Sequence, residues 1–541
     1  MTKLLLVLHT IRYLKPLQIR YQLWYRLRYF WRTLIGFNYQ LSIQKEGYPI
    51  KLNPFIPKYP SFTDYQFTFL NQSKVFSRND IDWNYNVFGK LWTYNLNYFD
   101  FLLQPEIMPE IGQALIEDFI PKLYKNFNAL EPYTIALRGI NWIKFLTVVA
   151  NGAKQPTQIS TINSSLYSQY QILIDNIEYH LLGNHLLEDG FSLLFGAFYF
   201  REEKLYLKAV EIIKQELNEQ ILNDGAHFEL SPMYHQIILD RLLDCINLVQ
   251  NNQRFRDQEN LLDGMKCKAV KMIHWLNAIT FRNGEIPLLN DATKGIAPTS
   301  QELMIYATQL GILKENAIDE IHTIPYNLKE SGYRRYNGIN YECILDIGQI
   351  GPSYQPGHAH ADTFNFVLNV NNQAYIVDTG ISVYEVGQTR LKERGTASHN
   401  TVTIGNWNSS GIWSSFRVAH RAKVHIIYEN EKTVIAEHEG YHRKGITHQR
   451  KWEFQEKQIQ ITDTLKGKNT EGKAHLWLSP LFYPEIKENR IYLENTILTF
   501  ENSGNVSLIK NLIPVGYNKY NESYKIEITF NGHLTTKIST N

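Results

Sequence analysis

Apolar residues recur at three- and four-residue spacing from about residue 99 to residue 313. This is the spacing of one face of an α-helix, so this half of the chain is predicted to be helical. Short polar breaks such as Asn151-Gly152 separate helices of about 12 to 20 residues. Successive helices of this length with short links predict helical hairpins stacked into a ring or a solenoid. The clearest apolar runs lie at residues 114–120, 140–146 and 166–182.

The period of the pattern changes to two after Tyr333. Alternating residues bounded by turn residues predict short strands, and many such strands predict an antiparallel sandwich. The junction between the two halves is expected near residues 323–335. The chain is thus divided into a segment 1–90, an all-α part 91–328 and an all-β part 329–541. The predicted strands are residues 340–347, 365–370, 374–378, 402–404, 422–428, 433–438, 450–455, 458–465, 474–478 and 491–493.

The first ninety residues are basic and aromatic at their start. Eight Lys and Arg residues precede the first acidic residue, Glu46. A basic helix packed on the body of the protein is the simplest interpretation, and peripheral contact with an anionic membrane or a polyanion is the alternative. The apolar run at residues 4–8 is too short for a signal-peptide core, and no small-residue cleavage site follows it. We therefore expect a cytoplasmic or membrane-peripheral protein rather than a secreted one, with a periplasmic location left open.

Composition narrows the classes of function. The 55 Lys and Arg residues nearly balance the 53 Asp and Glu residues, which argues against nucleic acid as a partner. Aromatic residues make up 13% of the chain, including 34 Tyr and 10 Trp, and such a chain is suited to stacking on sugar rings. The three cysteines are scattered, so they predict no disulfide framework and no Cys-based zinc site.

Potential metal ligands gather at the ends of neighbouring predicted strands in the β half. His358 and His360 precede one strand, Asp378 ends the next, and His399 opens a third. The nitrogen and oxygen donors of His360, Asp378 and His399 form a ligand set that Zn²⁺ accepts. If His358 and His360 lie in a turn, one can face a substrate and the other a metal. Arg394 adds a cation beside this stretch.

Two further candidates lie in the helical half. Asn184 offers a neutral amide that can bond a carboxylate, and His185 can exchange a proton near neutral pH. The alternative is that Asn184 only caps a helix. Ser231-Pro232 predicts a helix start, which places Tyr234 in the first turn, where the helix dipole favours a phenolate. Tyr234 there is a candidate general acid or base, or one more packed tyrosine.

Other enzyme classes fit less well. A phosphohydrolase with a His-Asp metal pair would need His360 and Asp362 on a helix, but the following residues alternate as a strand. Paired glycosidase carboxylates are conceivable at Glu188-Asp189 or at Glu285 and Asp291, although neither spacing is informative. The sequence contains no nucleophile elbow, P-loop or dinucleotide fingerprint.

The motifs taken together resemble the heparinase II/III group of polysaccharide lyases, which is related to certain alginate lyases. The resemblance rests on GHAHADTFNF, YIVDTG and RGTASHNTV in the β half, and on WTYNLNY, RGINW, GNH and the FE…YH run in the helical half. It extends from about Trp92 to Leu465. It implies an incomplete α/α toroid followed by an antiparallel β-sandwich, and a lyase that cleaves uronic-acid-containing polysaccharides by β-elimination.

The resemblance also implies roles for individual residues. Asn184, with His185, neutralises the uronate carboxylate, Tyr234 serves as acid, and His358 serves as base or aids charge neutralisation. A structural zinc ion held by His360, Asp378 and His399 braces the sandwich against the toroid. The expected substrate-binding residues are Tyr94, Asn97, Trp142, Glu229, Tyr384 and Arg394.

The absence of a recognisable signal peptide points to a protein that trims an acidic exopolysaccharide during its assembly. Two alternatives remain open: a non-catalytic glycan-binding protein on a lyase fold, and a metal-dependent hydrolase. The near-neutral net charge gives no sign of a sulfated substrate. The polymer, its linkage and the oligomeric state are not predicted.

Overall fold

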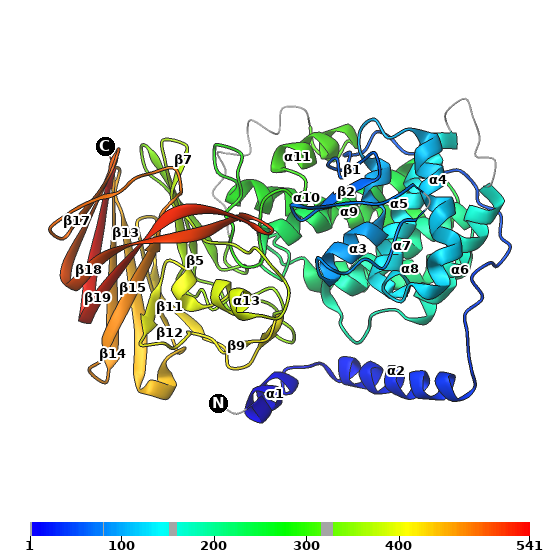
Figure 1. Ribbon diagram of the computed structural model, residues 1–541. Helices are drawn as coiled ribbons and strands as arrows, with labels where there is room; N and C mark the ends of the chain where they lie inside the picture. Colours follow the sequence, from blue (N-terminus) through cyan, green and yellow to red (C-terminus); the bar gives the residue numbers. More distant parts are fainter. Residues whose placement is uncertain (1–2, 79, 151–158, 315–327, 541) are drawn as a thin grey trace.

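The structure is a computed structural model that describes residues 3–78, 80–150, 159–314 and 328–540. Figure 1 shows a helical half beside a β half, with two N-terminal helices lying beneath them. This order confirms the predicted all-α part followed by an all-β part. The expected junction at residues 323–335 lies partly outside the described residues.

The helical half is built from alternating inner and outer helices. Inner helices α3, α5, α7, α9 and α11 contact one another in succession, while α6, α8 and α10 pack on them from outside. Helix α7 is buried on nearly all sides because it has neighbours on both flanks and behind it. The bounds are α3 Lys90–Tyr98, α4 Pro109–Phe119, α5 Pro132–Ala150, α6 Ile159–Asp175, α7 Gly183–Phe200, α8 Glu203–Gln220, α9 Pro232–Asn251, α10 Gln258–Ile279 and α11 Ser300–Gln309.

The β half contains two extended antiparallel sheets and a small two-stranded one, β9 (Ile412–Trp413) with β10 (Arg417–Val418). The smaller sheet has the order β4 (Tyr333–Asn337), β5 (Tyr341–Asp346), β6 (Phe366–Val370) and β7 (Gln373–Ile376). The larger sheet has the order β11-β12-β13-β14-β19-β18-β17-β16, and β15 joins β19 to β8. Its bounds are β8 Val402–Ile404, β11 Val424–Glu429, β12 Thr433–His438, β13 Ile446–Phe454, β14 Gln458–Gly467, β15 Glu471–Trp477, β16 Glu485–Lys487, β17 Arg490–Leu493, β18 Thr496–Gly516 and β19 Lys519–Thr540.

The smaller sheet holds the two halves of the molecule together. One face shares a core with the larger sheet, through residues such as Cys343 and Phe366. Its other face, which includes Ile344 and Val367, packs on Trp275 and other residues of the helical half. Strands β5 and β6 are therefore buried on both sides, which explains their nearly continuous burial. This double burial fixes the junction where the candidate site lies.

The long hairpin of β18 and β19 reaches from the sandwich to the helical half, as the red ribbon in Figure 1 shows. At its tip, Asn71 donates a 2.8 Å hydrogen bond to the carbonyl of Tyr517. Asn71 belongs to the turn between β2 (Gln66–Phe69) and β3 (Gln72–Val75), which pair with β1 (Phe62–Thr63). The tip therefore bridges both halves beside the cleft.

The segment before β1 contains α1 (Lys3–Ile11) and α2 (Pro16–Leu34). Helix α2 lies against the loop that follows α6, where Tyr25 donates a 2.5 Å hydrogen bond to the carbonyl of Ile177. Among the described residues, none of the helices has the length and apolar character needed to span a bilayer.

Candidate active site

A cleft of about 1040 Å³ lies at the junction of the two halves. Inner helices α3, α5, α7 and α9 form one wall, and loops of the β half together with Tyr517 form the other. All four residues predicted to be catalytic, Asn184, His185, Tyr234 and His358, line this cleft. The fold thus brings together residues that are up to 174 positions apart in the sequence, counted from 184 to 358.

Asn184 is held against Glu229 at one end of the cleft. Helix α7 begins at Gly183 with Leu182 as its N-cap residue, so the predicted capping role for Asn184 is wrong. The Asn184 side-chain amide instead donates to Glu229 Oε2 at 3.1 Å, and its backbone N–H lies 3.4 Å from Oε1. Burial raises the pKa of Glu229, although the nearby His358 opposes the shift. The amide is neutral, and the raised pKa makes the Glu229 carboxyl group hold its proton more readily. Together the two groups form a site that can receive an anion.

The backbone around this pair adopts unusual conformations. Leu182, Leu230 and Asn290 are not glycines, yet their φ angles are +62°, +57° and +57°. Each lies within two residues of Asn184, Glu229 or Asp291. Gly183 has φ +62°, and an added Cβ atom there would lie 2.9 Å from Glu229 Oε1. Such backbone strain concentrates at functional sites, where surrounding contacts maintain it.

His358 is oriented by a buried carboxylate. Its Nδ1 lies 2.9 Å from Asp291 Oδ2. Burial alone would raise the pKa of Asp291, but Arg390 and the two neighbouring histidines hold it well below its usual range. An ionised carboxylate only accepts hydrogen bonds, so His358 carries its proton on Nδ1. In the neutral ring, Nε2 is then a free acceptor, located 3.7 Å from Glu229 Oε2.

Tyr234 lies directly against His358, with ring centroids 3.9 Å apart. The predicted helix start is confirmed: Pro232 opens α9, and the Ser231 side chain accepts a hydrogen bond from the Tyr234 N–H. The Tyr234 hydroxyl lies 3.1 Å from the Tyr384 hydroxyl. Burial raises the pKa of Tyr234 far above its ordinary value, so the expected phenolate is corrected to a neutral phenol. Desolvation of this partly buried side chain outweighs the helix dipole.

His185 contacts a carboxylate and an aromatic ring of the helical half. Its Nδ1 is 3.0 Å from Glu178 Oε2, and its ring packs on Tyr133 at a centroid distance of 4.5 Å. Burial alone would lower the pKa of His185, but the Glu178 carboxylate outweighs it and the pKa is raised. His185 is therefore more readily cationic than an ordinary histidine.

The six predicted substrate-binding residues divide into two groups. Tyr94, Glu229 and Tyr384 line the cleft. Asn97, Trp142 and Arg394 do not, and this corrects their assignment. All three are fully buried. Asn97 bonds the carbonyls of Trp83 and Thr93, Trp142 packs in the aromatic core, and Arg394 donates to the carbonyls of Ala359, Ser414 and Ser415.

The three predicted metal ligands lie deeper, behind His358. His399 Nδ1 bonds Asp378 Oδ2 at 2.7 Å, and His360 Nε2 bonds Asp291 Oδ1 at 2.8 Å. In the described part of the chain, no three His, Cys, Asp or Glu side chains are arranged to hold a metal ion. Three buried atoms nevertheless lack a hydrogen-bond partner here: His360 Nδ1, His399 Nε2 and Asp362 Oδ2. The zinc site stays a prediction, and Asp362 joins its candidate donors.

Sequence reasoning missed two residues on which the site depends. Asp291 accepts from His358, His360 and Arg390, and the Arg390 bonds measure 2.5 and 2.6 Å. Tyr517, at the tip of the β18–β19 hairpin, lines the cleft beside Tyr384, with ring centroids 5.5 Å apart. The sequence considered Asp291 only as a partner of Glu285, which instead pairs with Lys294 at 2.8 Å. No local pattern marks either residue, because both act through contacts made far along the chain.

Two family models match the chain. Residues 324–539 match the model described as heparinase II/III-like, C-terminal, and residues 141–309 match the heparinase II/III N-terminus. A heparin-sulfate lyase from Bacteroides stercoris is 28% identical over 266 residues, which are 45% of this chain and 38% of that protein. One from Pedobacter heparinus is 22% identical over 289 residues, 49% of this chain and 42% of that protein. The chain thus spans about two fifths of the length of these relatives.

Solved structures show the same fold. A crystal structure of heparinase III has a TM-score of 0.66 at 17% identity, over 85% of this chain and 79% of that chain. A chondroitinase AC lyase has a TM-score of 0.52 at 10% identity, over 83% of this chain and 75% of that chain. The predicted architecture, a helical toroid followed by an antiparallel sandwich, is confirmed.

Proposed function

The chain belongs to the heparinase II/III-like family, and from this membership we propose that it is a polysaccharide lyase that cleaves a uronic-acid-containing polymer by β-elimination. One observation carries the proposal: Asn184 and Tyr234 from the helical half meet His358 from the β half in a single cleft. An amide, a phenol and an oriented imidazole are the three groups that this reaction requires.

Elimination starts with the carboxylate of the uronate. Removal of the adjacent C5 proton places charge on this group, so it must be neutralised. The Asn184 amide, which now donates to Glu229, is positioned to donate to the substrate carboxylate instead. Glu229, whose pKa is raised by burial, can share its proton with the same group. His185 adds positive charge from the side.

His358 and Tyr234 then exchange the protons. His358 Nε2 takes the C5 proton while Asp291 holds the Nδ1–H and stabilises the imidazolium that forms. The C5–H electron pair becomes the C4–C5 double bond, the C4–O4 bond breaks, and Tyr234 gives its proton to the departing O4. A neutral phenol is the form needed for this donation, and burial maintains it. Tyr384, at 3.1 Å, is placed to return a proton to Tyr234.

The charges that line the cleft favour a polymer with little or no sulfate. Apart from the histidines, the lining contains five basic side chains, Lys58, Lys90, Arg241, Lys294 and Arg417, and five acidic ones, Asp100, Glu188, Glu229, Asp240 and Glu385. Lys58, for example, is already paired with Asp240 at 2.7 Å. A heavily sulfated chain would meet little excess positive charge here. We therefore propose an acidic exopolysaccharide of low sulfate content as the substrate.

A structural zinc ion is proposed as well. It would be held by His360 and His399 with a carboxylate from Asp378 or Asp362. The support is chemical: two buried imidazole nitrogens and one carboxylate oxygen have no other partner. Zinc at this position would brace the turn that carries His358 and would take no part in the proton transfers.

The test is turnover of defined uronate polymers, followed by the ultraviolet absorbance of the conjugated product. Unsulfated heparosan, hyaluronan and alginate should be compared with heparan sulfate. We expect a double bond in the product of at least one unsulfated polymer and loss of that signal in Tyr234→Phe. Binding without turnover would favour a glycan-binding protein. Cleavage with incorporation of water from the solvent and no double bond would favour a hydrolase.

A further inference from the structure

Helix α2 has its polar face turned toward the protein. Gln18 is fully buried and donates to the Leu181 carbonyl at 3.1 Å and to Gln355 Oε1 at 3.0 Å. Farther along the helix, Arg28 and Arg32 lie 3.1 and 2.6 Å from the two carboxylate oxygens of Asp175. Hydrogen bonds and ion pairs, together with ring contacts of Tyr21 and Tyr25, fix this helix to the body. A surface helix of a globular protein ordinarily does the reverse.

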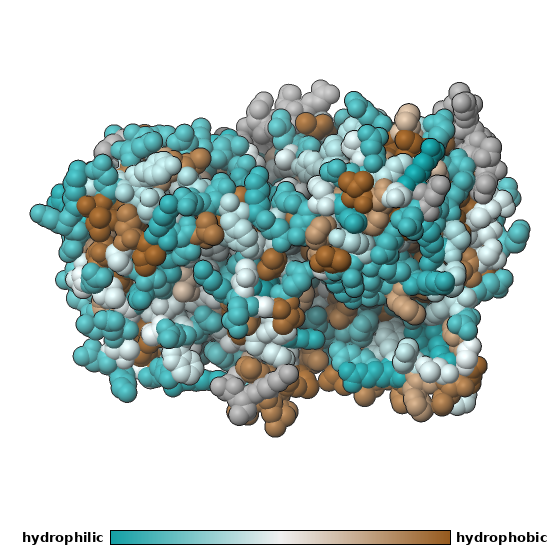
Figure 2. All heavy atoms as spheres, viewed as in Figure 1, coloured by the Kyte–Doolittle hydropathy of each residue, from teal (hydrophilic) through white to brown (hydrophobic). Residues whose placement is uncertain are grey.

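The outward face of α2 is apolar. Leu23, Trp24, Leu27, Phe30, Trp31 and Leu34 recur at helical spacing, and their exposed fractions lie between 53% and 66%. Helix α1 continues the stripe with Leu4, Leu8 and Ile11, which are also exposed. In Figure 2, brown residues gather along the lower edge of the molecule, where Figure 1 places α1 and α2. Single exposed apolar residues are ordinary, but a continuous stripe over two helices marks a docking surface.

The charges around this stripe identify what docks on it. Helices α1 and α2 contain no acidic residue, and Arg12, Arg20 and Arg26 are exposed beside the apolar face. Two copies of the face brought together would oppose arginines with no carboxylate on either helix to balance them. An anionic bilayer supplies both missing partners, phosphate groups for the arginines and acyl chains for the leucines. Tryptophan and tyrosine side chains also favour the bilayer interface.

We propose that α1 and α2 dock the protein on the surface of an anionic phospholipid bilayer, lying in the plane of the interface. Neither helix crosses the bilayer. The apolar stripe enters the boundary between head groups and acyl chains, and the flanking arginines bind lipid phosphate. The polar inner face remains bonded to the protein, so the body need not rearrange when it docks.

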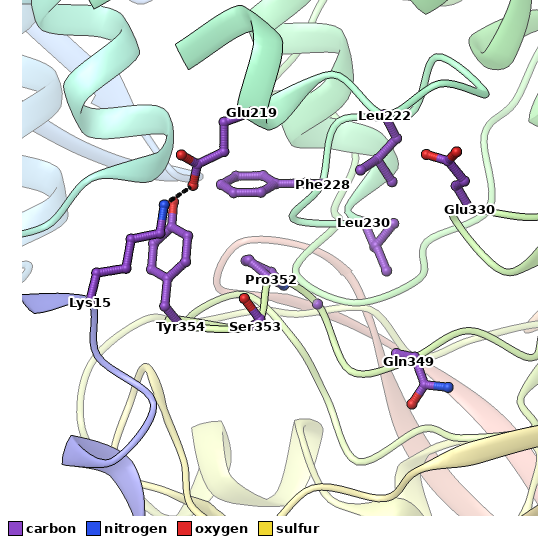
Figure 3. Close-up of a pocket in the computed structure, with 11 residues that line it drawn as sticks. Lys15, Glu219, Leu222, Phe228, Leu230, Glu330, Gln349, Pro352, Ser353 and Tyr354 are labelled. Carbon is purple, nitrogen blue, oxygen red and sulfur yellow. Dashed lines mark hydrogen bonds and ion pairs between the residues drawn. The ribbon is translucent and has the colours of Figure 1, made fainter. Parts of the chain in front are cut away.

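The junction between the two helices is fastened to both halves of the molecule. Lys15 forms an ion pair with Glu219 of α8, and its ammonium group lies 4.3 Å from the centre of the Tyr354 ring. Figure 3 shows these three side chains together at one end of a pocket of about 330 Å³. Tyr354, together with the two Gln18 partners Leu181 and Gln355, also lines the large cleft. A docked α2 would therefore hold the cleft at a fixed position close to the bilayer.

The experiment is vesicle sedimentation with the whole 541-residue chain. Vesicles of phosphatidylcholine alone are compared with vesicles that also contain phosphatidylglycerol, at low and high salt. We expect binding to the anionic vesicles that is at least about tenfold tighter than to the neutral ones and that weakens with salt. Arg20→Ser with Arg26→Ser should lower the affinity for anionic vesicles roughly tenfold or more.

The decisive variant combines Trp24→Glu, Leu27→Glu and Trp31→Glu, which should abolish binding. Its matched control combines Leu481→Glu and Tyr483→Glu, two apolar residues that are 64% and 86% exposed on the sandwich. The control should bind as the unmodified protein does. Circular dichroism melting checks that each variant folds, and binding is measured without any substrate, so the outcome is independent of lyase activity.

Three results would overturn the proposal. The first is no binding of the unmodified protein to either vesicle at low salt. The second is equal binding by the triple variant and the unmodified protein. The third is a concentration-dependent dimer, seen by light scattering, that the triple variant converts to a monomer, because the apolar face would then be a contact between copies of the chain.

Discussion

His358 and Asp291 are 67 residues apart in the sequence, yet His358 Nδ1 lies 2.9 Å from Asp291 Oδ2. The same carboxylate is held by Arg390 through bonds of 2.5 and 2.6 Å. A loop of the helical half thereby sets the tautomer of a histidine from the β half. The proposed base exists only while the two halves stay together.

Replacing Asp291 by Asn should therefore impair both catalysis and stability. The tautomer of His358 would no longer be fixed, so kcat should fall ~100-fold or more. Arg390 would lose its buried partner, which costs about 3 to 5 kcal/mol of unfolding free energy. Turnover and denaturant unfolding measure the two effects.

Asp463→Asn is the matched control for this variant. Asp463 also pairs with a buried arginine, Arg450 at 2.6 Å, and with His448 at 2.6 Å, but it lies in the sandwich core away from the cleft lining. It should lose comparable stability and keep its kcat under conditions where it is folded. Equal kcat losses in both variants would mean that Asp291 acts only through stability.

Tyr234→Phe should reduce kcat about a thousandfold, because the leaving oxygen loses its acid. Tyr384→Phe should have a smaller effect, since the proposed role of Tyr384 is to return a proton to Tyr234 and not to protonate the leaving oxygen. Tyr170 is a fully buried tyrosine outside the cleft lining, and its hydroxyl accepts a 3.3 Å bond from Ser192, so Tyr170→Phe should leave kcat unchanged. The proposed role of Tyr234 fails if the Tyr170 and Tyr234 variants turn over at similar rates.

Gly183→Ala should lower kcat/KM by at least about tenfold, because the added Cβ would meet Glu229 Oε1 at 2.9 Å and displace it from Asn184. Strain from the positive φ should also cost about 1 kcal/mol or more of stability. Gly284→Ala separates the two effects, since its φ is +84° and nothing lies within 4 Å of the added atom. It should lose stability alone; an equal loss of kcat/KM would argue against the Asn184–Glu229 site.

His185 should give the apparent KM a dependence on pH. Burial lowers its pKa but the Glu178 carboxylate outweighs burial, so the pKa stands above the ordinary 6.5. Below this raised pKa the ring is cationic and helps to bind the uronate carboxylate. As the pH rises through it, the charge is lost and KM should increase. Glu178→Gln should move this rise to lower pH, and His185→Gln should remove it. A KM profile unchanged in both variants would contradict the assignment.

Bound zinc should be detectable by elemental analysis of the purified protein. Chelation should lower Tm, and added zinc should restore it, because the metal would brace the turn that carries His358. His399→Ala should contain no zinc and should melt like the chelated protein. Protein without zinc that neither binds added zinc nor shifts in Tm would refute this site.

The sequence by itself determined the order of the two halves. The apolar residues recur with a period of about 3.6 in the first half and of two in the second. This pattern depends only on residues close in the sequence, so it can be read without the tertiary structure. The sequence also made Asn184, Tyr234 and His358 candidates through their local motifs, and all three line one cleft. The sequence could not distinguish side chains that face the cleft from side chains in the interior. Trp142 and Arg394 lie in motifs as distinctive as that of Asn184, yet both are fully buried.

Only the tertiary structure decided which residues complete the site and how α2 is oriented, because both depend on burial and on contacts between residues distant in the sequence. Asp291 belongs to the site because it accepts hydrogen bonds from His358 and Arg390. Tyr517 reaches Tyr384 because the β18–β19 hairpin extends to the cleft. Burial, which no local pattern reports, keeps Tyr234 a neutral phenol although it lies at a helix start. The sequence likewise showed that the N-terminus is basic and aromatic. That Gln18, Arg28 and Arg32 face inward while the apolar stripe faces outward is decided by what α2 packs against.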